Sequence, residues 1–275
     1  MILKIMWSGG VKICHIKIHN DMAIKTSKFS KNQQWTDKLW LVHPKGKCVS
    51  FNGIDQYAIL PSSLYSVWNN LNAGTISLWF NLRTISETNT NDFNSIFFAK
   101  QHDNIDSYSI FGTIYSGGTT KLKFQMRNGI AIEGVNAISL DTWHYAQVAW
   151  NWNGVHGSIS LYLDANLDRV GTISGGLPND SSPTIMQIGA WSAVDLFTDG
   201  MLDELSLFNK SKGYGTAVQL YNDGKGVCGN TNVDPWNDGL LAGYHLDGSA
   251  DFSGNSHHLD LNGSVVIPNH VNICS

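Results

Sequence analysis

Glutamate is scarce in this sequence of 275 residues, where it occurs only as Glu87, Glu133 and Glu204. Helical proteins use glutamate freely, so its scarcity argues against a helical bundle. Charged residues make up only 15% of the chain, whereas there are 27 glycines, 10 tryptophans, 9 tyrosines and 11 phenylalanines. Aromatic residues are enriched in strands and glycine in tight turns, so the composition favours an all-β fold.

Cysteine is also sparse. The four cysteines, Cys14, Cys48, Cys228 and Cys274, are too few and too scattered for a disulfide framework or a zinc site, and none has the CxxC spacing. We therefore expect buried free thiols as the default. In an oxidising medium, Cys228 and Cys274 could pair and hold the C-terminus in place.

Long apolar runs are missing as well. No stretch of about 18 apolar residues exists, so no membrane span is predicted. The opening stretch MILKIMWSGGVKICHIKIH has no uninterrupted apolar region and no convincing cleavage site, so no secretory signal is predicted. The net charge of −4 means that the chain lacks the excess of positive charge with which proteins bind nucleic-acid phosphates, so nucleic acid is not expected as a partner.

The cationic residues concentrate at the N-terminus, where nine lysines precede residue 50 out of 18 lysines and arginines in all. We assign residues 1–36 to an N-terminal extension or docking arm. Two interpretations stay open for its charge. The lysines could be solvated and guard strand edges against pairing, or the arm could dock on the acidic surface of a partner.

Short strand-like segments follow one another from Leu39 onward, separated by turn signals such as NGI, RNG, WNG and TDG at intervals of about 8–12 residues. This spacing is typical of a β-sandwich or barrel. One short helix is expected near 216–222, whereas SLYSVWNNLNAG is interpreted as a polar loop. We assign 37–226 to the main domain and 227–275 to a C-terminal segment that packs on it.

The stretch Ile185–Lys210 predicts two strands joined by a polar loop. In the second strand, the period of two places Asp203 on the same face as Met201, Leu205 and Leu207. If that face is the core, a carboxylate lies beside it, which is costly unless the charge is paired or bound to a metal.

Several segments together resemble the laminin-G-like jelly rolls of the concanavalin A-like lectin/glucanase superfamily, in their bacterial and phage form. They are CVSFNGIDQYAIL, TISLWFNL, DTWHYAQVAWNWNG, SISLYLDANL, MQIGAW, GMLDELSLFN and AVQLYNDGKG. The resemblance implies an antiparallel two-sheet jelly-roll sandwich, a carbohydrate- or protein-binding role and, often, a structural calcium ion. It does not cover residues 1–36.

Glycoside hydrolysis is not predicted, although the superfamily includes glucanases. Retaining glycosidases need two carboxyl groups about 5–5.5 Å apart, and the related laminarinases place them on one strand as E-x-D-x-E or E-x-D-x-x-E. The three glutamates are too far apart in the chain to form that motif. GxSxG, HExxH and P-loop motifs are also absent, so we do not expect an enzyme.

Calcium is the stronger metal candidate, because hard cations prefer carboxylate, amide and carbonyl oxygens. By the resemblance, Asp203 corresponds to an ion-ligating aspartate of the last core strand. Asp251 and Asn255 in the turn DFSGNSHH could supply further oxygens, and Asn52 stands where many relatives have aspartate. The alternative is that Asp203 accepts backbone N–H groups or caps a turn, and that Asn52 serves its turn.

For glycan binding, the candidates are aromatic side chains on loops beside polar groups. Trp191, Asp195 and Phe197 flank the loop between the last two core strands, and Trp152 with His156 flank another. For each tryptophan, structural packing is the competing explanation. The loop from Ser192 to Gly200 is where we expect ligand contact.

These observations predict a non-enzymatic binding or structural protein. The segment LLAGYHLDGSADFSGNSHHLDLNG also resembles a segment of this family, which follows the core in phage-type members. This resemblance and the basic arm favour a component of the virion surface, such as a capsid decoration, head-fibre or tail-associated protein. Its partners would be cell-surface glycans or other virion proteins, and an assembly could contain several copies. A bacterial surface or secreted adhesin is the alternative, and a glycosidase the third candidate.

Overall fold

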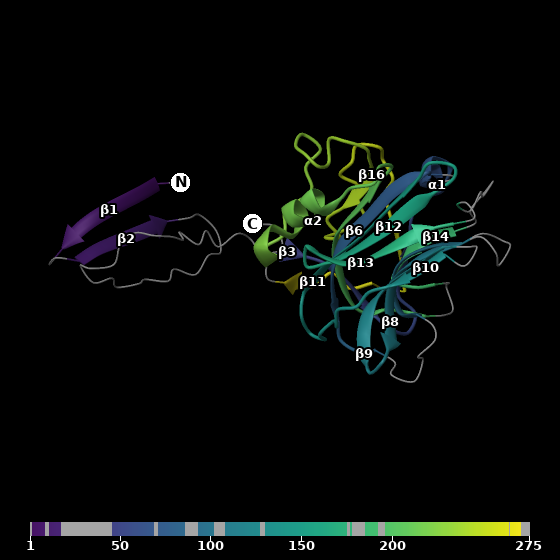
Figure 1. Ribbon diagram of the computed structural model, residues 1–275. Helices are drawn as coiled ribbons and strands as arrows, with labels where there is room; N and C mark the ends of the chain where they lie inside the picture. The colour runs from purple at the N-terminus through teal and green to yellow at the C-terminus, as the bar shows by residue number, and fades with distance from the viewer. Residues whose placement is uncertain are drawn as a thin grey trace. The chain divides into compact units, whose positions relative to one another are not determined.

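The structure is a computed structural model and describes residues 2–8, 11–17, 46–68, 71–85, 93–101, 108–126, 130–174, 177, 185–191, 196–263 and 265–270 (Figure 1). The chain divides into two compact units, Met1–Val42 and His43–Ser275. In the first unit, β1 (Ile2–Ser8) and β2 (Val11–Lys17) form an antiparallel hairpin.

The second unit is a sandwich of two antiparallel sheets, which confirms the predicted fold class. The first, named here the β8 sheet, has the order β10 (Ile130–Glu133), β9 (Thr119–Met126), β8 (Ser109–Ser116), β7 (Phe93–Gln101), β14 (Ile185–Ile188), β5 (Tyr57–Ile59), β17 (Asp260–Asn262). The second, the β6 sheet, has the order β13 (Asn166–Ile173), β12 (Gly157–Leu163), β11 (His144–Trp152), β6 (Ala73–Leu82), β15 (Asp199–Phe208), β16 (Leu240–Tyr244). In addition, β4 (Val49–Asn52) pairs with β15, and β3 (Gly46–Lys47) pairs with β18 (Asn269–His270).

The core fills the space between the two sheets because alternate residues of each strand point inward. Phe80 of β6 and Phe97 of β7 meet across it, with ring centroids 4.5 Å apart. Phe111 packs edge-on against Phe97 at 5.7 Å. Each of these rings is fully buried, and burial of one such side chain stabilises the fold by about 1.5–3 kcal/mol.

Two helices accompany the sheets. The predicted one is α2 (Tyr214–Tyr221), but α1 (Ser62–Trp68) forms where a polar loop was expected. Leu64 and Trp68 explain the difference, because their i, i+4 spacing puts both on one helical face, which is buried. Within the residues described, neither helix is long and apolar enough to cross a membrane.

The C-terminal segment supplies strands to both sheets. β16 pairs with β15 of the β6 sheet, and β17 pairs with β5 of the β8 sheet. A second apolar cluster, on the outer face of the β6 sheet, joins strand residues Trp79, Tyr145 and Phe208 to Leu220 of α2 and to Trp236. In Figure 1, α2 lies beside the strands of this sheet.

β15 contains an irregularity that the sequence pattern does not reveal. The pairing of β15 with β6 shifts register between Asp203 and Ser206, and Glu204 has a positive φ of 47°. Asp203 therefore lies opposite Trp79, on the outer face of the sheet, whereas the core receives Leu202, Leu205 and Leu207. The predicted placement of Asp203 on the same face as Leu205 and Leu207 is wrong, because one extra residue in a bulge inverts the alternation that follows.

Candidate functional site

The outer face of the β8 sheet carries a third apolar cluster. Its buried members are Phe93, Ile96 and Ala99 of β7 and Ile110 of β8. Tyr108, Trp191 and Leu196 pack against them and are only partly buried. This face therefore places an aromatic pair at the surface, on the side of the sheet away from the core.

Tyr108 and Trp191 form that pair, with ring centroids 5.7 Å apart and planes nearly perpendicular. Gln125 belongs to the same group, because its side-chain amide donates a hydrogen bond of 2.5 Å to the Tyr108 hydroxyl. In the strand pairing, Gln125 lies opposite Ile110, so its side chain projects from the same face. Trp191, Tyr108 and Gln125 are named here the Trp191 patch.

Thr198 fixes the far end of the loop that begins at Trp191. Its fully buried hydroxyl donates to the Ile96 carbonyl at 2.7 Å and accepts the Ile96 N–H at 2.9 Å. The Thr198 N–H donates to the Gly189 carbonyl at 2.7 Å, and the Gly189 N–H donates to Ile96. Both ends of the loop are thus held against β7, which gives the patch a rigid base.

The five predicted glycan-binding residues fall into two places. Trp191 and Phe197 lie at the two ends of one loop, and Phe197 packs against Tyr57 at 6.3 Å. Asp195 lies outside the described residues. Trp152 packs against the core at the β11–β12 hairpin, and exposed His156 belongs to the same turn, in the other sheet. Which of these residues contacts a ligand stays a prediction.

The four predicted calcium ligands serve separate local structures. Asp251 accepts four hydrogen bonds, from Gly243 N–H, Ser253 N–H, the Ser253 hydroxyl and His257 N–H. This arrangement corresponds to the alternative of a carboxylate satisfied mainly by backbone groups.

The remaining predicted ligands have other partners. The side-chain oxygen Oδ1 of Asn52 accepts the N–H groups of Ile54 and Asp55, and the side-chain Nδ2 of Asn255 donates to the Leu241 carbonyl. Asp203 accepts the Glu204 N–H at 2.8 Å. These contacts give little support to one shared ion, and calcium stays a prediction. If an ion stabilises the fold, chelation with EDTA should lower the melting temperature.

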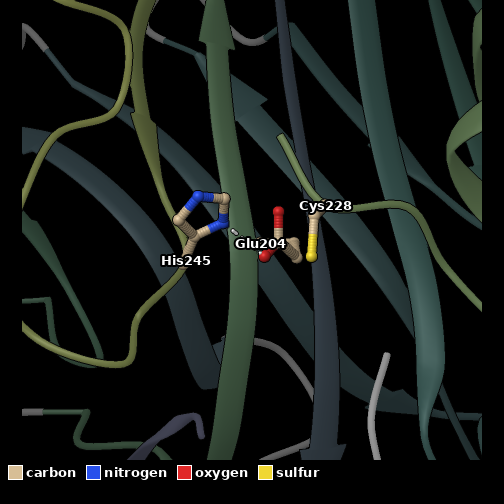
Figure 2. A group of neighbouring side chains, drawn as sticks. All are labelled: Glu204, Cys228 and His245. Atoms are coloured by element: carbon tan, nitrogen blue, oxygen red, sulfur yellow. Dashed lines mark hydrogen bonds and ion pairs between the residues drawn. The ribbon is translucent and has the colours of Figure 1, made fainter. Parts of the chain in front are cut away.

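Glu204, Cys228 and His245 bring their ligand atoms within 4.8 Å of one another (Figure 2). The set resembles a zinc site in composition, but Cys228 is disulfide-bonded and so offers no thiolate. The default expectation of a free thiol is confirmed for Cys48, which is free and buried. For Cys228 the alternative of a disulfide holds, and whether Cys274 is its partner stays a prediction. The side chains of Cys14 and Cys274 lie outside the described residues.

What remains of this cluster is an ion pair between buried Glu204 and half-buried His245. His245 Nδ1 lies 2.7 Å from Glu204 Oε1, and the other Glu204 oxygen accepts the Gly229 N–H at 3.0 Å. The His245 ring stacks on Phe252, with centroids 4.5 Å apart. The hydrogen bond to Glu204 raises the pKa of His245, so the pair favours a charged imidazolium.

Two members of the Trp191 patch were missed from the sequence. Tyr108 and Gln125 lie in the segments SYSIFG and TKLKFQM, which belong to the series of strand-like segments that follows Leu39. The period of two in TKLKFQM assigns Gln125 to the face opposite Leu122 and Phe124. The sequence does not indicate which loop lies next to that face. The pairing of β7, β8 and β9 is what brings these residues close to Trp191.

Comparison with known proteins identifies the fold. Residues 52–213 match a laminin-G-type family model described as the concanavalin A-like lectin/glucanases superfamily. No curated protein matches the sequence. A Bacteroides ovatus protein whose suggested role is carbohydrate binding superposes with a TM-score of 0.60 at 15% identity, covering 83% of this chain and 62% of that one. The chain thus spans less than two thirds of that protein. The heptameric SAP-like pentraxin of Limulus polyphemus superposes with a TM-score of 0.52 at 15% identity, covering 84% and 98%.

Proposed function

The chain belongs to the concanavalin A-like lectin/glucanase superfamily, and from this premise we propose that it binds carbohydrate at the Trp191 patch. The observation that carries the proposal is the partly exposed Trp191–Tyr108 pair beside the Gln125 amide. A sugar ring presents apolar C–H surfaces and a rim of hydroxyls. Partly exposed aromatic rings match the first, and an amide, which both donates and accepts hydrogen bonds, matches the second.

The rigidity of the patch supports this role. Tyr108 and Trp191 restrain each other through an edge-to-face contact, and the loop that begins at Trp191 is tied to β7 through Thr198. Binding to a surface that is already ordered loses little conformational entropy, so weak individual sugar contacts can sum to measurable affinity. The suggested role of the Bacteroides ovatus protein points in the same direction.

We propose binding without cleavage of glycosidic bonds. Glu204 is buried and paired with His245, and Glu133 is exposed on β10, in the other sheet. Glu87 lies outside the described residues. Release of reducing sugar from a panel of polysaccharides would contradict this part of the proposal and favour the glycosidase alternative.

The test is a binding measurement on a glycan array, followed by calorimetry on the best ligand. Replacement of Trp191 by alanine should weaken binding at least tenfold, which corresponds to about 1.4 kcal/mol, because it removes the larger stacking surface. Tyr108→Phe should weaken it less, because the ring remains.

Trp152→Ala is the matched control, since Trp152 is a partly buried tryptophan on a different hairpin. Full binding by the Trp191 variant together with loss in the Trp152 variant would move the site to the β11–β12 turn. Absence of binding to any glycan would favour a purely structural role.

We propose in addition that the protein is a component of a virion surface. Its support is the separate unit Met1–Val42, which contains the hairpin β1–β2 and seven of the nine early lysines. We propose that this unit attaches the sandwich to a particle. The protein should then co-purify with particles, and deletion of Met1–Val42 should abolish attachment. Recovery only from the cell surface or the medium would favour the adhesin alternative.

A further inference from the structure

A serine, a histidine and an aspartate from three segments are linked by hydrogen bonds at one end of the β6 sheet. Ser139 Oγ lies 2.9 Å from His144 Nε2. His144 Nδ1 lies 2.7 Å from Asp164 Oδ2. The second oxygen of Asp164 accepts the Tyr145 N–H at 2.8 Å. The order of these atoms is that of a serine–histidine–aspartate triad.

The contacts also fix where the proton of the imidazole lies. An ionised carboxylate can only accept, so in neutral His144 the nitrogen facing Asp164 carries the hydrogen. Nε2 is then the acceptor and faces the Ser139 hydroxyl. This is the tautomer that a general base needs in order to remove a proton from serine.

The backbone holds each of the three residues in place. Asp164 lies in the tight turn between β12 and β13 with a φ of 50°, and its N–H donates to the Tyr145 carbonyl at 2.9 Å. The connection that carries Ser139 is tied down on both sides, by Ile138 N–H to Thr120 and by Asp141 N–H to Leu82, each at 2.8 Å. The geometry is therefore preorganised, as catalysis requires.

The serine is the most accessible of the three residues and the histidine the most buried. Ser139 is exposed, His144 is buried with 8% of its surface accessible, and its ring packs on Phe80 at 5.6 Å. The side chain of Asp164 is 26% exposed. A reagent in solution can reach Ser139 Oγ, whereas the base behind it is held in a fixed orientation.

We propose that Ser139, His144 and Asp164 form a hydrolytic site for carboxylic esters. Ser139 Oγ attacks the acyl carbon and gives its proton to His144 Nε2. The acyl C–O bond then breaks, and His144 returns the proton to the departing alcohol, which leaves an acyl–serine. Water attacks this ester, gives its proton to His144, and releases the carboxylic acid with Ser139 restored. Asp164 is the positioning residue that orients the imidazole and stabilises its charged form.

This site is independent of the Trp191 patch and of the proposed glycan binding. It also differs from the enzyme classes that the sequence argued against, because GxSxG is a contiguous motif. Ser139, His144 and Asp164 are spread over three segments, and folding alone assembles them. Nothing in the sequence pattern around Ser139 marks it as a nucleophile.

The test uses the full chain and two probes. A fluorophosphonate, which transfers its phosphonyl group to an activated serine and releases fluoride, should label Ser139, as read by peptide mass spectrometry. Hydrolysis of 4-nitrophenyl acetate should fall at least 100-fold in Ser139→Ala and in His144→Gln. Asp164→Asn, which keeps an acceptor for Tyr145, should lower kcat and the rate of labelling while leaving KM within about twofold.

The chain offers a matched control in Ser63, whose Oγ lies 2.9 Å from His257 Nδ1. Among the residues described, no carboxylate hydrogen-bonds the His257 ring, so Ser63 should stay unlabelled. Ser63→Ala should hydrolyse the ester at the wild-type rate. Equal labelling of Ser63 and Ser139, or an unchanged rate in Ser139→Ala with wild-type melting temperature, would overturn the proposal.

Discussion

Glu204 and His245 form an ion pair that ties β15 to the residue directly after β16. The Glu204 side chain is only 5% exposed, and one of its carboxylate oxygens lies 2.7 Å from His245 Nδ1. The hydrogen bond from His245, aided by the charges of Asp247 and Asp203, raises the pKa of His245 above its ordinary value of 6.5. The folded protein therefore holds this proton more tightly than the unfolded chain does.

The raised pKa predicts a pH-dependent contribution to stability. A group with a raised folded pKa contributes fully below its unfolded value, about 6.5, and the contribution disappears as pH rises through the folded pKa. The melting temperature of His245→Gln should therefore fall furthest below that of the wild type near pH 5.5, and the gap should narrow toward pH 8–9. Thermal unfolding of both proteins across this range is the measurement, and a gap that widens with pH would contradict the assignment.

The strands were predictable because apolar and polar residues alternate along them in the sequence. The bulges that interrupt this alternation were not predictable. The pattern of GMLDELSLF identifies β15 correctly, yet the bulge at Glu204 turns Asp203 outward. α1 was missed because its buried face has only two residues, Leu64 and Trp68, among polar neighbours. In both cases the local sequence pattern does not contain the tertiary packing that determines the structure.

Gly189, just after β14, determines how the chain enters the loop of the Trp191 patch. Its φ is +85°, and a Cβ there would lie 2.9 Å from the Phe51 ring. Gly118 in the β8–β9 turn has a similar φ of +80° with no atom within 4 Å, which makes it the matched control.

Alanine at these two positions should have different effects. At Gly118 it should cost about 1–2 kcal/mol of unfolding free energy, from the left-handed backbone alone. At Gly189 it should cost roughly 1–3 kcal/mol more, because the ring of Phe51 must move, and it should also weaken glycan binding. Urea denaturation measures both. Equal costs would show that the close approach to Phe51 does not restrain this loop.

At the scale of the whole molecule, the C-terminal segment belongs to the sandwich. β16 covers the edge of β15, β17 covers β5, and the Tyr244 hydroxyl, fully buried, donates to the His257 carbonyl at 2.7 Å. The family match ends at residue 213, before any of these contacts.

Two truncations should therefore behave in opposite ways. Removal of residues 227–275 should prevent cooperative unfolding, since it exposes two sheet edges and the buried faces beneath them. Removal of Met1–Val42, a compact unit of its own, should leave the melting temperature of the sandwich nearly unchanged. Circular dichroism during heating distinguishes these outcomes, and a folded chain that lacks 227–275 would contradict this account.

The candidate site was predictable only in part, for a reason that also applies to the whole fold. Trp191 was singled out because it flanks a polar loop in the sequence, and Phe197, at the other end of that loop, packs against Tyr57 instead of joining the patch. Tyr108 and Gln125 come from strands whose order in the sheet brings them together, and that order is not visible in the sequence. The same holds for Ser139, His144 and Asp164.

The most direct test of carbohydrate binding at the Trp191 patch is fluorine NMR on protein labelled with 5-fluorotryptophan. Replacement of single tryptophans by phenylalanine assigns the signals of Trp191 and Trp152. On titration with the best ligand from a glycan array, the Trp191 signal should shift and saturate, because a sugar ring stacked on the indole changes its surroundings, while the Trp152 signal stays in place. A saturating shift of Trp152 with Trp191 unmoved would contradict the account.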